Sequence, residues 1–145
     1  MPVDQDVVYL KTQRILREDA EVRMDKDGLL TVVLNEIRVT VKIEPHPRSQ
    51  AVLVRISAPV LLSLVETPDL NKYVAFHGHK WVFGRLGLTM REDGLCDLNV
   101  SHTLLGDFLD PAELKYVVHG IAGAVESLDE SLQSQYGGVL PQSTA

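Results

Sequence analysis

The sequence has 145 residues, of which 45% are hydrophobic and 23% charged, and its formal net charge is −6. This length and composition favour a single soluble globular domain with its own core, and the one cysteine, Cys96, excludes an intrachain disulfide. We therefore expect one domain over residues 1–138 and a flexible tail over residues 139–145.

The acidic excess lies entirely in the second half of the chain. Nine basic and nine acidic residues occur up to Val65, whereas five basic and eleven acidic residues follow it. Nucleic acids and anionic membranes attract Lys and Arg, so this balance favours a protein, peptide or small ligand as partner. No apolar run approaches the roughly 20 residues of a membrane span, and the N-terminus does not resemble a secretory signal. We expect a cytoplasmic protein that binds neither nucleic acid nor membrane.

The first predicted element is a helix from Gln5 to about Asp19, with Asp4 as its N-cap. Its apolar face is predicted to contain Val7, Val8, Ile15 and Leu16. Four strands with alternating apolar residues follow, at Glu21–Met24, Leu29–Leu34, Ile37–Ile43 and Ala51–Ile56.

Prolines and turn residues delimit the middle of the chain. Pro45-His46-Pro47 ends one strand and Pro59 ends the next, because proline cannot donate to a ladder. Residues 59–65 fit a strand or a helix equally well. Thr67-Pro68-Asp69 then begins a short helix over Asp69–Phe76, which Gly78 closes.

A strand pair and a long helix complete the predicted fold. Trp81–Met90 and Leu95–Leu104 alternate in hydrophobicity around a tight turn, and the helix runs from about Asp110, its N-cap, to Tyr136. The stripe of this helix contains Leu114, Val117, Val118, Ile121, Val125, Leu128 and Leu132. The order predicts an α+β fold, an antiparallel β-meander sheet flanked by an N-terminal, a short middle and a long C-terminal helix.

Several of these segments resemble the YbjN-like domain family, whose fold is similar to that of the small type III secretion chaperones. The resemblance rests on the strand LVRIS, the hairpin WVFGRLGLTMREDGLCDLNV (81–100), the helix start Asp110-Pro111-Ala112-Glu113 and the acidic segment VESLDESL (125–132). It implies a type III secretion chaperone-like α+β domain that tends to form homodimers and binds extended peptide or protein segments.

The predicted strand at 81–90 supplies the first candidate binding residues. Trp81, Phe83 and Arg85 lie on one face of this strand, where exposed aromatic side chains would mark a contact with a peptide or protein partner. The alternative is that helices cover both faces and these residues belong to the core.

The long helix supplies a second candidate surface. Gly120, Gly123 and Ala124 form a patch of small residues in its middle, and interior glycines cost about 1 kcal/mol each relative to alanine. Such a patch indicates the close approach of another element, which is either the sheet or a second subunit. We predict a dimer interface here and keep sheet packing as the alternative.

The histidines and the cysteine give little support for a metal site or a catalytic site. His77 and His79 with Cys96 have ligand types suited to zinc, but their spacing matches no metal motif. We therefore predict no metal, no cofactor and no catalytic residue. The leading hypothesis is a non-enzymatic, chaperone-like or regulatory domain that binds protein or peptide through an apolar surface of its sheet. The alternatives are a structural homodimer without a client, and a metal protein or enzyme that uses these three residues.

Overall fold

The computed structural model describes residues 4–141, which form an antiparallel sheet and helices in the order expected for an α+β fold. The elements are α1 (Gln5–Arg17), β1 (Val22–Met24), β2 (Leu30–Leu34), β3 (Ile37–Pro45), β4 (Val52–Leu64), α2 (Pro68–His77), β5 (Arg85–Met90), β6 (Cys96–Leu105), the 3₁₀ helix η1 (Gly106–Phe108) and α3 (Pro111–Tyr136). The six strands lie in the order β1-β2-β3-β4-β6-β5, so β1 and β5 are the edges. The predicted fold class is confirmed.

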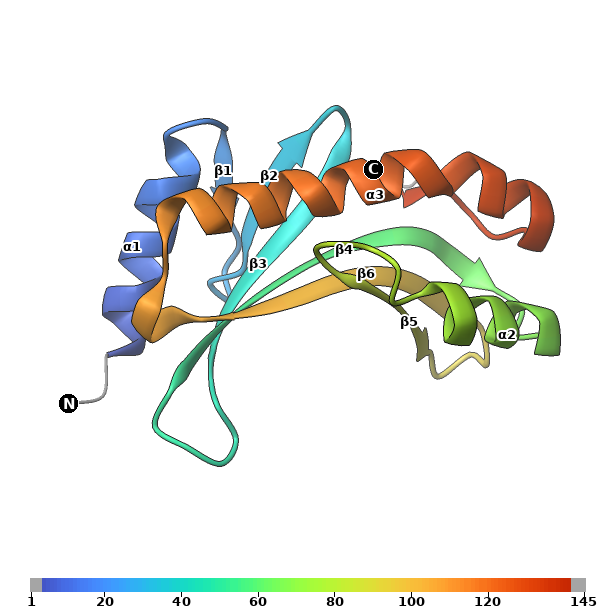
Figure 1. Ribbon diagram of the computed structural model, residues 1–145, viewed down its shortest axis with the longest axis horizontal. Helices are drawn as coiled ribbons and strands as arrows, with labels where there is room; N and C mark the ends of the chain where they lie inside the picture. Colours follow the sequence, from blue (N-terminus) through green and yellow to red (C-terminus); the bar gives the residue numbers. More distant parts are fainter. Residues whose placement is uncertain (1–3, 142–145) are drawn as a thin grey trace.

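One face of the sheet is covered by helices and the other is open. α3 crosses over β3, β4 and β6 with α1 beside it, while α2 lies against β5 at the far end (Figure 1). Strand side chains alternate between the two faces, so every second residue of β3 is buried beneath the helices. The predicted apolar stripe of α3 supplies the other half of the core. Six of its seven residues are buried, and the seventh, Leu128, is half-buried. Within residues 4–141, no helix is long and apolar enough to span a bilayer.

The helix starts follow the sequence closely because capping is local. The side chains of Asp4, Thr67 and Asp110 each accept a backbone N–H of the first turn of α1, α2 and α3. The predicted face of α1 is partly wrong. Val7 is exposed, and Thr12 is buried in its place with its hydroxyl bonded to the Val8 carbonyl at 2.7 Å.

The prediction that Pro59 ends a strand is wrong. β4 continues through it to Leu64, so the ambiguous residues 59–65 are mainly strand. Pairing of β4 with β3 stops at Ser57, so Pro59 has a neighbouring strand on one side only. The register with β6 also shifts just after Pro59, and such irregularities are where sheets accommodate proline.

The predicted strand over Trp81–Met90 begins four residues late. Residues 81–84 form a loop, and β5 starts at Arg85. Gly84 has a φ of +92°, and a Cβ there would lie 2.8 Å from a Val100 methyl group. The chain thus turns sharply at Gly84. Any residue with a Cβ would be strained at this φ and would force the Val100 side chain to move.

The flexible tail predicted from residue 139 stays a prediction. Val139 itself is paired with Leu62 through two backbone hydrogen bonds of 2.8 Å, beyond the glycines that end α3. Residues 142–145 of the predicted tail lie outside the described residues.

The packing of the helices on one face of the sheet predicts which side chains cannot be shortened without a loss of stability. Ile56 is fully buried in the central strand β4, so Ile56→Ala should lower the free energy of unfolding by about 2–5 kcal/mol. Val82→Ala is the control, because Val82 is 88% exposed and its loss should change that free energy by less than about 0.5 kcal/mol. Urea unfolding measures both, and equal effects would contradict this packing.

Candidate functional site

The outer edge of β5 offers unpaired backbone groups. β5 pairs only with β6, and the Leu86 N–H points away from β6 because it donates to the Gly78 carbonyl at 2.9 Å. Backbone groups alternate along a strand, so the N–H and C=O groups of Leu88 and Met90 point outward too. Within residues 4–141 no other segment pairs with them. The edge therefore presents a template on which another strand can form.

An aromatic cleft lies on α2, the helix that contacts β5. It has a volume of about 510 Å³ and lies between α2 and the end of α3, with Tyr73, Phe76 and Tyr136 among its lining residues. Tyr73 stacks on His77 with ring centroids 4.9 Å apart, and Tyr136 tilts against Tyr73 at 5.9 Å. Burial, and then the nearby Tyr136, raise the pKa of Tyr73. An open cleft with an exposed phenylalanine can accept an apolar side chain.

This cleft was not predicted, although the sequence contains a signal for it. Tyr73, Phe76 and His77 are spaced three and four residues apart, so they share one face of a helix. Only Leu70 of α2 is buried, and although Tyr73 is half-buried against Tyr136, Phe76 and His77 on the same face are exposed.

The loop before β5 brings two of the predicted sites together. Phe83 packs on α3, and a Cβ at Gly120 would lie 3.4 Å from its ring. Phe83 also meets His102 edge-on at 5.8 Å, and the Gly84 N–H donates to His102 Nδ1 at 3.2 Å. The close approach expected at Gly120 is therefore made by a loop of the same chain. Trp81 is half-buried in this loop.

The other members of the small-residue patch have different surroundings. Ala124 is buried in the core of its own chain. Gly123 is exposed, and a Cβ there would meet nothing within 4 Å. Gly123 thus has no packing reason for lacking a side chain within the described residues.

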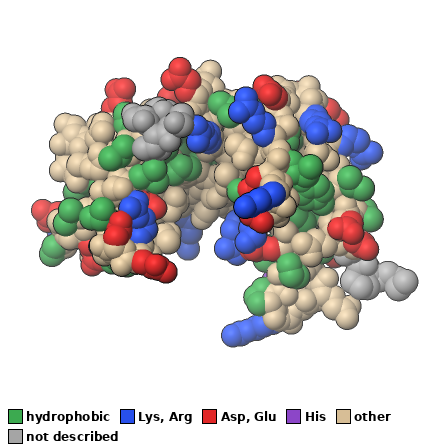
Figure 2. Space-filling view, turned by 180° about the vertical axis from the view of Figure 1, so that it is seen from behind, with side chains coloured by type: hydrophobic (Ala, Val, Ile, Leu, Met, Phe, Trp, Pro, Cys, Tyr) green, Lys and Arg blue, Asp and Glu red, His purple; other side chains and the backbone are tan. Residues whose placement is uncertain are grey.

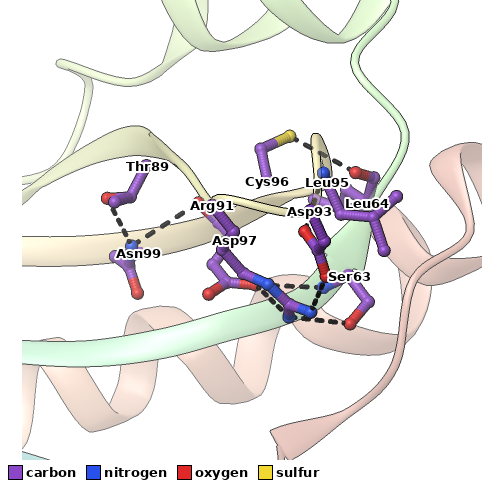
Figure 3. Close-up of polar contacts among 9 residues, drawn as sticks. All are labelled: Ser63, Leu64, Thr89, Arg91, Asp93, Leu95, Cys96, Asp97 and Asn99. Atoms are coloured by element: carbon purple, nitrogen blue, oxygen red, sulfur yellow. Dashed lines mark hydrogen bonds and ion pairs between the residues drawn. The ribbon is translucent and has the colours of Figure 1, made fainter.

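Arg85 is exposed on the open face of the sheet, and among residues 4–141 it makes no hydrogen bond or ion pair with Asp97 or Asn99 on the neighbouring strand. Asp97 instead accepts from Arg91 at 3.3 Å and from the Ser63 N–H at 3.0 Å, while Arg91 also donates to the Ser63 hydroxyl at 2.9 Å (Figure 3). Ser63 has a φ of +58°, so these bonds hold the irregular end of β4 against the β5–β6 turn.

The same turn holds a further carboxylate. Arg91 also pairs with Asp93, and hydrogen bonding between them is the main cause that lowers the pKa of Asp93 and raises the pKa of Arg91. Asp93 in turn accepts the Leu95 N–H at 3.0 Å. These contacts connect neighbouring parts of the turn, so we assign them a structural role.

His77 and Cys96 make separate local contacts, and His79 is exposed. His77 stacks on Tyr73 and lies 2.8 Å from Lys80 Nζ, whereas Cys96 is buried and donates to the Leu64 carbonyl at 3.5 Å. Burial, followed by the charges of Glu66 and Asp97, raises the pKa of the Cys96 thiol and so disfavours the reactive thiolate. Across residues 4–141, no three ligands of the His, Cys, Asp or Glu type cluster in a way that could hold a metal.

A family model and solved structures match this chain. The model described as "T3SS (YopN, CesT) and YbjN peptide-binding chaperone 1" matches residues 5–144. A comparison with curated protein sequences finds no match.

Three of the similar structures share the fold at low sequence identity. YbjN from E. coli has 13% identity and a TM-score of 0.57, covering 94% of this chain and 96% of its own. The Yersinia pestis type III secretion chaperone SycH, solved with a stable fragment of YscM2, has 11% identity and a TM-score of 0.55, covering 83% and 98%. A chain of the ExsC–ExsE complex has 14% identity and a TM-score of 0.54, covering 83% and 92%.

The open space at Gly123 yields a stability prediction. Gly123→Ala should raise the free energy of unfolding by about 0.5–1 kcal/mol, because alanine restricts the unfolded chain and meets no neighbour here. Gly120→Ala is the matched control and should gain less, since its methyl group would touch the Phe83 ring. Urea unfolding of both variants measures the difference, and destabilisation by Gly123→Ala would contradict it.

Proposed function

Since the chain belongs to the family of type III secretion (YopN, CesT) and YbjN peptide-binding chaperones, we propose that it binds an extended segment of a protein partner without catalysing a reaction. In this proposal the protein acts in the cytoplasm, as its one free thiol agrees with a reducing compartment. The client segment is held by backbone pairing and by side-chain anchoring.

The free edge of β5 is the observation that carries this proposal. An extended segment that aligns with β5 gains hydrogen bonds from the outward groups of Leu88 and Met90 without depending on its own sequence. The exposed Arg85 at the start of β5 and the half-buried Trp81 just before it flank such a segment. We retain both as contact residues, and we assign Phe83 the role of positioning the loop because it packs on α3.

The aromatic cleft on α2 supplies specificity in this proposal. Backbone pairing discriminates little between sequences, so an apolar anchor residue of the client would select it by entering the cleft beside Tyr73 and Phe76. The open face of the sheet is largely polar. We therefore assign the binding of apolar client residues to α2 and the edge of β5 instead of that face.

Two structures of similar fold have protein partners, which supports a protein client here. SycH was solved with a fragment of YscM2, and ExsC with ExsE. Their identity to this chain is 11% and 14%, so they support the class of partner and leave the client to experiment.

A homodimer is the second candidate, favoured by Gly123. An exposed glycine in a helix interior is costly, and close approach of a second subunit would account for it. Light scattering of the wild type and of Gly123→Lys tests this, because a long charged side chain would separate two closely packed helices. A dimer that becomes monomeric in the variant supports the interface, and a monomeric wild type contradicts it.

Proline at position 88 tests the pairing at β5. Leu88→Pro removes an outward N–H that β6 does not use, so it should weaken binding about tenfold or more while the sheet stays folded. Leu88→Val is the matched control, since it shortens the side chain but keeps the N–H group. Dodecapeptides selected on the wild-type protein from a random displayed library serve as probes, with fluorescence anisotropy as the measurement. Equal binding by both variants would contradict the pairing.

Phenylalanine truncation tests the cleft separately. Phe76→Ala should weaken the binding of the same peptides by about 1–2 kcal/mol, because it removes one wall of the cleft. Phe108→Ala provides the control, as Phe108 is exposed on η1, outside the cleft. Equal losses for the two variants would assign the effect to general surface hydrophobicity and exclude the cleft as the anchor site.

A further inference from the structure

The open face of the sheet has a row of four hydroxyl side chains on its inner strands, with an arginine on each of the two edge strands. Strand register aligns one residue from each strand in an unbroken series, which runs Arg23, Thr31, Thr40, Ser57, Ser101 and Arg85 from β1 to β5. The hydroxyls of Thr40 and Ser57 lie 3.0 Å apart, so these two members of the row are in contact. Hydroxyl groups donate as well as accept, and this row therefore offers donors to an anionic or carbonyl ligand.

The charge of this face is opposite in sign to that of the whole chain. Two acidic side chains of the strands lie on the open face, Glu44 and Asp97. Five are cationic, Arg23, Arg38, Lys42, Arg55 and Arg85. The face thus has a formal charge of about +3, whereas the chain has −6, which leaves about −9 on all other surfaces.

Two of these cations are available to a ligand. Glu44 pairs with both Lys42, at 3.5 Å, and Arg55, at 3.0 Å, so one carboxylate serves two cations. Arg38 and Arg85 are exposed and form no ion pair within residues 4–141. Guanidinium groups match carboxylates in geometry and bind them with two parallel hydrogen bonds.

The shape of the face suits an extended ligand. Seen from behind, the molecule is hollowed below its middle, and Lys and Arg side chains lie along the upper border of the hollow (Figure 2). The β3–β4 hairpin and the α2 end of the molecule project on either side of it (Figure 1). At the β1 end of the face, a depression of about 440 Å³ is lined by Arg23, Thr31, Arg38 and Thr40 among others.

We propose that the open face binds an acidic segment of a protein partner, with its carboxylates on the arginines and its backbone on the hydroxyl row. A peptide fits better than a nucleic acid, because double-stranded DNA has a charge about every 1.7 Å along its axis, and even one strand has one about every 3.4 Å, so that a nucleic acid needs many cations. The surrounding acidic surface would repel such a dense polyanion but tolerate a short segment with a few carboxylates. The proposal rests on the proposed function and specifies the chemistry of the client.

A set of matched peptides tests the charge preference. Fluorescein-labelled (Glu-Ser)₅, (Gln-Ser)₅ and (Lys-Ser)₅ are titrated with the protein at about 50 mM and 300 mM salt. We expect the glutamate peptide to bind about tenfold or more tightly than the glutamine peptide at low salt, and to weaken at high salt. Equal binding of these two peptides, or tighter binding of the lysine peptide, would overturn the proposal.

Charge-matched variants locate the binding surface. Arg38→Gln/Arg85→Gln should weaken binding of the glutamate peptide about tenfold, as both side chains lie on the open face and neither forms an ion pair within residues 4–141. Arg14→Gln/Arg17→Gln removes the same charge from the exposed side of α1 and should weaken it less than about twofold. Equal losses would overturn the proposal by assigning binding to net charge.

Two further comparisons separate this proposal from its alternatives. If a dT₁₀ oligonucleotide binds more tightly than the glutamate peptide, the face is a nucleic-acid surface and the proposal fails. If library-selected peptides bind in a manner that Leu88→Pro abolishes while the glutamate peptide does not bind, the proposed function stands and only this inference fails. If neither the library-selected peptides nor the glutamate peptide binds, both proposals fail.

Discussion

The alternation of side chains along the strands is the constraint on which the rest of the structure depends. Each second residue of β3, and of β4 from Val52 to Val60, is apolar and packs beneath the helices, while most of the residues between them are polar and face outward. A shift of register by one residue would exchange these two sets, so the buried set fixes the pairing of the strands. The same constraint aligns the hydroxyl row and the arginines on the open face. Packing on one side of the sheet thus determines the chemistry of the other.

Much of the fold follows from the sequence because its signals are local. The cap residues Asp4, Thr67 and Asp110 define the helix starts, and alternation identifies the strands. Predictions fail where distant parts of the chain decide the outcome. Pro59 remains in a strand because the pairing of β4 with β3 stops at Ser57, so β4 has a partner strand on one side only at Pro59. Residues 81–84 leave the strand because Phe83 packs on Gly120 of α3, which no local pattern reveals.

The candidate site was harder to predict for the same reason. The sequence suggests candidate residues around position 85, but that β5 is an edge strand follows only from the order β4-β6-β5. The aromatic face of α2 was present as a spacing of Tyr73, Phe76 and His77, yet its exposure depends on the neighbours of α2. The distribution of charge also depends on the fold and is not predicted by the net charge. A net charge of −6 argues against anionic partners, whereas strand register collects five cations on one face.

The proposed edge pairing makes a prediction about individual backbone groups. Amide hydrogen exchange measured by NMR, with and without a library-selected peptide, tests it most directly. The account predicts that the outward amides of Leu88 and Met90 exchange more slowly in the complex, since they gain a hydrogen-bond partner. The amides of Gly87 and Thr89, which face β6, should change much less. A bound peptide that leaves the exchange of Leu88 and Met90 unchanged would contradict binding at the edge of β5.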